Sequence, residues 1–181
     1  YWDFNDPSDP TTAADVSGNA PSAELLGSAS YSEDGDGYSG AVGDYALDLG
    51  EVNDQSTAVT SEGDHFSEPF DTNELSVAFW QNTTAVGNTS AFWMVAPNAT
   101  GSQRGFQAHT PWGNNTIYFD QSGCCDPPQR ITAAGKAIVD QWQHFVFQRD
   151  ADGNQQIWVD GEKAAESLGT AEALEAFTKI T

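Results

Sequence analysis

The chain has 181 residues, of which 12% are aromatic, and this aromatic content with six tryptophans excludes a disordered chain. Its length suits one domain with a two-layer core. Six Lys and Arg against 27 Asp and Glu give a net charge of −21, which disfavours nucleic acid and anionic membranes as partners because both require a cationic surface.

The first third of the chain places short strand-like runs between loops rich in Pro, Gly and Asp. An aromatic run at residues 1–5 is expected to form the first strand, and residues 24–31 the second. Residues 45–49 alternate apolar and polar side chains, which predicts a third strand. The polar stretch that follows has room for one short strand near residues 58–59.

The remainder of the chain contains the stronger strand signals. Residues 142–161 predict a hairpin, because Phe145 and Phe147 alternate with polar neighbours, Ile157 and Val159 do the same, and an Asp-Gly turn separates the two runs. The other expected strands span residues 75–81, 91–95, 105–109 and 116–120. The one helical candidate is residues 170–177. Short strands separated by Gly, Pro and Asn turns predict an all-β fold, a two-sheet antiparallel sandwich.

Several of these segments resemble those of laminin G-like, concanavalin A-like jelly-roll domains. Residues 142–161 contain W-x-H-F-x-F-x-R-D followed by I-W-V-D-G, which is similar to the family's central hairpin. Residues 1–6 (YWDFND), 15–19 (DVSGN) and 74–80 (ELSVAFW) resemble its first strand, the next loop and an inner strand. The resemblance implies one laminin G-like jelly-roll domain over residues 1–181. Since the family usually finishes with two further strands, we expect a trimmed chain that lacks its last strands.

The two cysteines, Cys124 and Cys125, are adjacent. Consecutive Cα atoms lie about 3.8 Å apart, below the usual disulfide range of roughly 4.4–6.8 Å, so a bond between them is strained and locks a tight turn. A vicinal disulfide is favoured because secreted chains seldom keep free thiols. Two free thiols and a thiolate metal site are the alternatives, although the three scattered histidines offer no zinc-type spacing.

The surroundings of this pair suggest a ligand site. The segment from residue 104 to residue 131 resembles a bacterial subgroup of the family in which an adjacent Cys pair follows an I-Y-F-D strand. The resemblance implies that the disulfide and Trp112 present apolar plates to a sugar, while polar neighbours bond to its edge. The expected ligand-binding residues are Arg104, His109, Trp112, Asp120, Cys124, Cys125 and Arg130. In the alternative interpretation, Trp112 is a loop anchor and each arginine pairs with an acidic neighbour such as Asp120 or Asp126.

The acidic composition raises the question of Ca²⁺, which takes several oxygen ligands. Asp15 and Asn19 resemble the calcium-binding corner of many such jelly rolls, so Ca²⁺ is expected there as a structural ion. An Asx-turn loop without an ion is the alternative. The charge also fits a simpler role, solubility in a salty or extracellular setting.

Catalysis is not expected. Retaining β-glucanases of this fold carry E-x-D-x-x-E or E-x-D-x-E on one strand, which sets two carboxylates about 5–5.5 Å apart, and no such strand occurs. A G-x-S-x-G elbow is also missing.

These features together predict a non-catalytic binding or adhesion module at the cell surface or outside the cell. The expected partner is a glycan or surface polysaccharide, with copies of itself or other modules of a larger chain as further possibilities. Membrane insertion is not expected, because no run of 18 apolar residues occurs. The alternative is a structural subunit that assembles into a surface layer or filament, followed by a glycan-cleaving enzyme.

Overall fold

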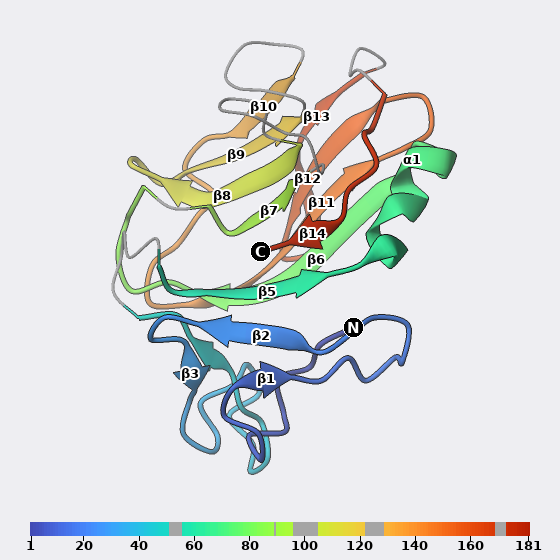
Figure 1. Cartoon of the computed structure of the whole chain (residues 1–181). Coiled ribbons are helices and arrows are strands. Elements are labelled where there is room, and N and C mark those ends of the chain that lie inside the picture. The colour runs from blue at the N-terminus through green and yellow to red at the C-terminus, as the bar shows by residue number, and fades with distance from the viewer. Residues whose placement is uncertain (51–55, 89, 96–104, 122–128, 169–172) are drawn as a thin grey trace.

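The computed structural model describes residues 1–50, 56–88, 90–95, 105–121, 129–168 and 173–181. They form a sandwich of two antiparallel sheets, which confirms the predicted fold class (Figure 1). The larger sheet has the order β1-β2-β5-β14-β7-β8-β9-β10. Its strands are Thr12–Ala13, Ala23–Leu26, Ala58–Glu62, Lys179–Ile180, Phe92–Val95, Phe106–Trp112, Thr116–Gln121 and Arg130–Ala133.

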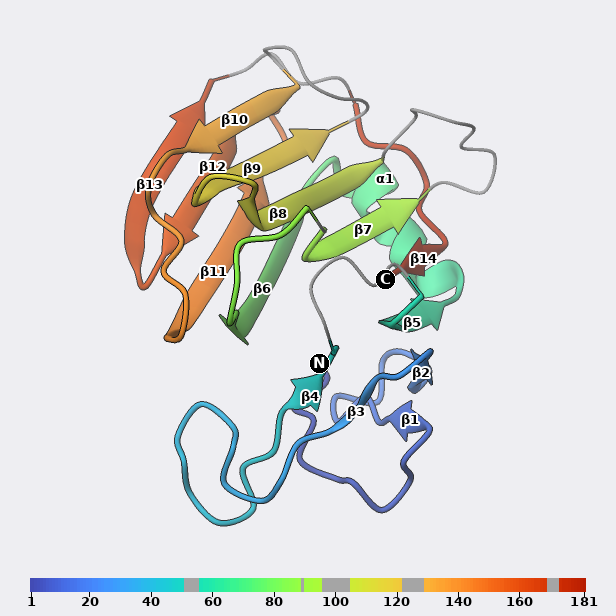
Figure 2. The same ribbon diagram turned by 90° about the vertical axis from the view of Figure 1, so that its left-hand side faces the viewer.

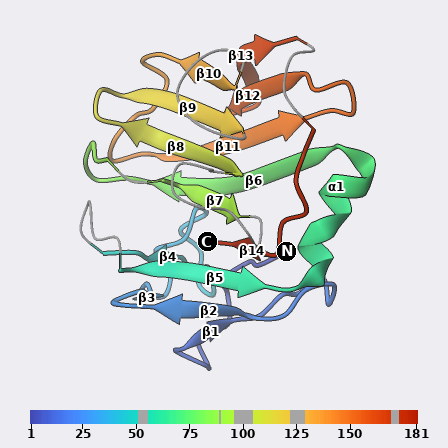
Figure 3. The ribbon, with the colours of Figure 1, turned by 45° about the horizontal axis from the view of Figure 1, so that its top comes forward.

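The smaller sheet has the order β13-β12-β11-β6. Its strands are Glu162–Ser167, Gln155–Val159, Trp142–Arg149 and Leu75–Asn82. In Figure 3 this sheet lies behind β7–β10, whereas β5, β2 and β1 extend beyond it. A separate pair, β3 (Ser30–Tyr31) and β4 (Leu47–Asp48), belongs to the N-terminal part of the chain.

The predicted hairpin is confirmed as β11 and β12. Phe145 pairs with Val159 and Phe147 with Ile157, so the apolar side chains of both strands share one face. The turn is closed by the Gly153 N–H, which donates to the Asp150 carbonyl over 2.9 Å. Gly153 has φ 81°, a conformation that glycine adopts without steric cost.

The core lies between the two sheets and is rich in phenylalanine. Phe106 and Phe119 from the larger sheet meet Phe147 from the smaller one, and all three are fully buried. The rings of Phe119 and Phe147 have centroids 5.4 Å apart. Burying one such ring contributes about 1.5–3 kcal/mol, so this cluster holds the sheets together.

Two N-terminal strand predictions need correction. Residues 1–5 form no strand, because Phe4 has φ 58°, which breaks the extended conformation. Residues 24–31 divide into β2 and β3, because a turn at Gly27 with φ 66° separates them. The predicted strands at 45–49 and 58–59 are present as the shorter β4 and the longer β5.

The helix was also predicted at the wrong position in the chain. The described part of residues 170–177 (173–177) is irregular, and Leu174 and Phe177 pack into the core there. The helical residues are instead a 3₁₀ turn, Asp64–Ser67, and α1, Glu68–Thr72. Pro69 stands in the first turn of α1, and the Asn73 N–H donates to the Pro69 carbonyl to close its end. No helix in the described ranges is long and apolar enough to cross a membrane.

Candidate functional site

The site is built on the outer face of the larger sheet. Strands alternate their side chains, so Phe106 and Ala108 enter the core while Gln107 and His109 point outward. Strands β7, β8, β9 and β10 lie side by side in Figure 2. Their register aligns the residues that point outward from each strand. One row across the four strands is Trp93, Gln107, Asp120 and Arg130.

A second row lies beside the first. His109 pairs with Tyr118, and Trp112 follows at the end of β8, where it pairs with Thr116. We call the two rows together the sheet-face site. Its members are Trp93, Gln107, His109, Trp112, Tyr118, Asp120 and Arg130.

Asp120 is the charged centre of the sheet-face site and is fully buried. Arg130 binds it in a two-pronged manner, with Nε 2.5 Å from Oδ1 and Nη2 2.6 Å from Oδ2. Gln107 Nε2 donates to Oδ2 over 2.9 Å, and His109 Nε2 lies 3.6 Å from the same oxygen. Such bidentate arginine–carboxylate pairs are strong and fix orientation.

This environment decides the charge of Asp120. Burial alone would raise the pKa of Asp120, but hydrogen bonds from Arg130, His109 and Gln107 outweigh burial and lower the pKa from 3.8 to about 2. The hydrogen bond from Asp120 in turn raises the pKa of Arg130. The pair is therefore ionised on both sides at neutral pH.

Aromatic rings surround this polar centre. The Arg130 guanidinium carbon lies 4.5 Å from the centroid of the Tyr118 ring, and the rings of His109 and Trp112 have centroids 4.6 Å apart. Trp93 and Trp112 are each 38% exposed. The centre is thus buried, whereas two tryptophans present ring surface to solvent.

The structure brings together four of the predicted ligand residues, namely His109, Trp112, Asp120 and Arg130. The alternative in which Arg130 pairs with Asp120 is confirmed. The other three predicted residues lie outside the described ranges; they are Arg104, Cys124 and Cys125.

Sequence reasoning missed three members of the sheet-face site, Trp93, Gln107 and Tyr118. Trp93 stands in the run AFWMV, which suggested a strand apolar on both faces. The available signal was the alternation of core residues at 92, 94, 106 and 108, which assigns position 93 to the outer face.

The predicted metal residues form a tight loop. Both side-chain oxygens of Asp15 accept hydrogen bonds. Oδ1 accepts from the Tyr1 amino group and from the backbone N–H of Ser17. Oδ2 accepts from the backbone N–H groups of Asn19 over 2.8 Å and Ala20 over 2.7 Å. The hydrogen bond from the amino group lowers the pKa of Asp15 first of all. As arranged, hydrogen-bond donors already occupy both oxygens of Asp15, so these residues do not fit Ca²⁺ without rearrangement. Calcium binding stays an untested prediction, and this arrangement agrees better with the alternative, an Asx-turn loop without an ion.

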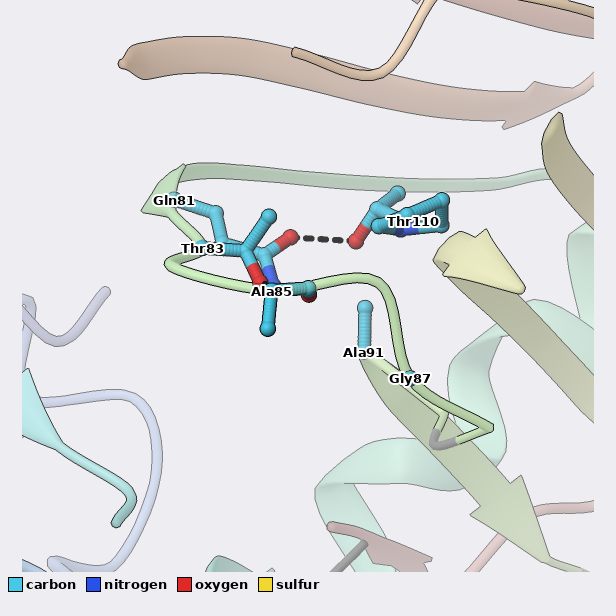
Figure 4. Close-up of a pocket in the computed structure, with 7 residues that line it drawn as sticks. Gln81, Thr83, Ala85, Gly87, Ala91 and Thr110 are labelled. Carbon is cyan, nitrogen blue, oxygen red and sulfur yellow. Dashed lines mark hydrogen bonds between the residues drawn. The ribbon is translucent and has the colours of Figure 1, made fainter. Parts of the chain in front are cut away.

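The described residues also form two hollows. The first, about 30 Å³, is bordered by Gln81, Thr83 and Thr110, and the Thr110 hydroxyl donates to Gln81 Oε1 (Figure 4). It suits water and is too small for a sugar. The second is an open groove of about 580 Å³ between α1 and the smaller sheet, and no aromatic residue lines its described walls.

Residues 53–179 match the concanavalin A-like lectin/glucanases superfamily. The chain belongs to this superfamily. No curated protein matches it. The superfamily match includes every member of the sheet-face site, whereas Asp15 and Asn19 lie before it.

Several solved structures have the same fold as this chain. The binding domain of botulinum neurotoxin DC, solved in complex with SialylT, has a TM-score of 0.63 at 16% identity, covering 93% of this chain and 39% of that one. The receptor binding domain of botulinum neurotoxin type G has a TM-score of 0.59 at 14% identity, covering 93% of this chain and 39% of that one. The binding domain of Paraclostridial mosquitocidal protein 1 has a TM-score of 0.60 at 12% identity, covering 93% of this chain and 41% of that one. The chain thus spans about two fifths of these structures, and the likeness shows a shared fold.

Proposed function

We propose that this domain is a non-catalytic extracellular binding module whose ligand is a glycan held on the sheet-face site. The observation that carries the proposal is the pair of half-exposed tryptophans, Trp93 and Trp112, beside a buried and fully hydrogen-bonded polar centre. Ring faces suit the C–H faces of sugars, and a few oriented polar groups supply specificity.

The fold neighbours support the same proposal. All three are binding domains by name, and one was solved in complex with SialylT. An extracellular or cell-surface location agrees with the acidic composition.

The chemistry of the strands supports a role without catalysis. Asp120 is the single Asp or Glu on β7, β8, β9 and β10, whereas glycoside hydrolysis generally uses two carboxylates flanking the bond. One of the two must also be protonated to act as the acid. The ion pair with Arg130 keeps Asp120 ionised, so it cannot serve as that acid at neutral pH.

Replacing Trp112 tests the proposal. Trp112→Ala is expected to weaken glycan binding on an array about tenfold, because the variant loses a ring face worth roughly 1–2 kcal/mol. The matched control is Trp80→Ala, which removes a tryptophan of similar exposure (42%) from the outer face of the opposite sheet. If both variants bind as the wild type does, the ligand does not use the sheet-face site.

A second candidate function is self-assembly, which one observation favours. β6 is an edge strand of eight residues that pairs with β11 alone among the described strands, and none of its residues is charged. Natural proteins usually shorten or charge such edges to prevent pairing between molecules. The edge at β13 follows that rule, since it carries Glu162, Lys163 and Glu166.

A further inference from the structure

The basic residues of this chain are few, and their positions restrict what the sheet-face site can bind. The sequence has six, against 27 acidic residues. Arg130 lies in the site and donates two hydrogen bonds to Asp120. Arg149 is buried in the other sheet, where it donates to the Asn73 carbonyl and to Gln121.

Of the lysines, one lies on the other sheet and one lies near the site but is paired. Lys163 is on β13 of the smaller sheet and pairs with Glu166 over 2.5 Å. Lys179 is on β14 beside β7, opposite Val95, and pairs with Glu62 over 3.0 Å. Lys136 is exposed in the segment between β10 and β11. Within the described residues, therefore, no lysine lies on β7–β10, and the one arginine there is neutralised. Arg104 lies outside these ranges.

An acidic sugar would meet two obstacles at this site. Its carboxylate or sulfate needs a charge-assisted bond, and Arg130 could supply one only by leaving Asp120. That exchange would strand a buried anion, which is strongly unfavourable. In addition, a protein of net charge −21 repels anions at separations up to about the Debye length of 10 Å at 0.1 M salt.

A neutral sugar meets neither obstacle. Its hydroxyl groups can accept from Arg130, whose side chain is 18% exposed, without separating Arg130 from the buried Asp120. Its C–H faces can pack on Trp93 and Trp112. We infer that the sheet-face site takes neutral glycans and rejects sialylated, uronic or sulfated ones, an inference that rests on the proposed glycan-binding function.

The test is a glycan array in which each neutral oligosaccharide stands beside its sialylated and sulfated counterparts. We expect binding to neutral members, with a loss of about tenfold or more when an acidic group is added. Binding that is confined to acidic members would overturn the inference while leaving glycan binding intact. Binding to no member of any pair would overturn the proposed function and the inference with it.

A variant on an exposed position gives a second measurement that does not disturb the buried pair. Thr132 is exposed on the outer face of β10, where it pairs with Tyr118. Thr132→Lys should raise the binding of acidic members relative to neutral ones about tenfold, because it supplies the missing cation. Thr132→Gln is the matched control and should leave that ratio unchanged. If Thr132→Lys also leaves it unchanged while both variants fold, charge does not set the selectivity.

Discussion

At the scale of single residues, the Asp120–Arg130 pair makes a prediction about acid stability. The folded protein lowers the pKa of Asp120 from 3.8 to about 2. A lowered pKa stabilises the folded state fully above pH 3.8, and this stabilisation is lost as the pH falls through about 2. Its size is about 2 kcal/mol. We therefore expect Asp120→Asn to reduce the free energy of unfolding at pH 7 by at least this amount.

The pH dependence separates this effect from general destabilisation. The gap in unfolding free energy between wild type and Asp120→Asn should narrow by about 2 kcal/mol between pH 5 and pH 2 in urea titrations. A gap that stays constant over this range would show that the ionisation of Asp120 does not contribute. Asp152→Asn is a suitable control, because Asp152 is exposed in the hairpin turn.

The cysteine pair carries a second residue-scale prediction, which the described residues do not test. We expect Cys124 and Cys125 to be bonded to each other in protein from an oxidising compartment. Alkylation without reductant should modify neither cysteine, and alkylation after reduction should modify both. Mass spectrometry detects the modification. Two labelled thiols in the native protein would contradict the prediction.

Among the site residues, His109, Asp120 and Arg130 were expected because they lie in the segment that resembles the family subgroup with an adjacent Cys pair. The structure places these three side chains together, and their role in binding a ligand stays a prediction. Trp93 was missed, because its neighbours Phe92 and Met94 are apolar and the run offers no visible alternation. Membership in the sheet-face site depends on register between β7 and β8, which is a long-range property.

At the scale of elements, the uncharged edge of β6 provides a test of self-assembly. If its uncharged edge pairs between molecules, Ala78→Lys should reduce association at high protein concentration, because a lysine on an edge strand opposes pairing. Sedimentation velocity over a concentration series would measure this. Thr132→Lys adds the same charge to the short edge strand β10 and serves as the control. Equal behaviour of wild type and both variants would exclude β6 as an assembly surface.

The elements themselves were predicted to different degrees, for physical reasons. Strands with period-2 alternation over six or more residues, such as β6 and β11, were located almost to the residue. The two-residue strand β14 was missed because it is too short to show a period. It forms through pairing with β5 and β7, which lie far away in the sequence. The segment 173–177 contains helix-favouring residues, but burial of Leu174 and Phe177 overrides that preference.

At the scale of the whole molecule, the net charge of −21 affects stability. Repulsion among the carboxylates opposes the compact state, so any added salt is expected to stabilise the fold by screening. Divalent cations screen in the same way, and this general effect must be separated from binding at one site. The loop of Asp15 is the place where such a site was predicted.

The loop geometry leads to a definite expectation for calcium. Because N–H and O–H donors already occupy both oxygens of Asp15, Ca²⁺ and Mg²⁺ at equal ionic strength should raise Tm by the same amount. A specific site at 100 times its Kd would add about 2.7 kcal/mol, or roughly 5–10 °C, for Ca²⁺ alone. Thermal scans with each ion, repeated on Asp15→Asn, distinguish the two cases. A calcium-specific rise that disappears in Asp15→Asn would show that the loop exchanges its hydrogen-bond donors for the ion.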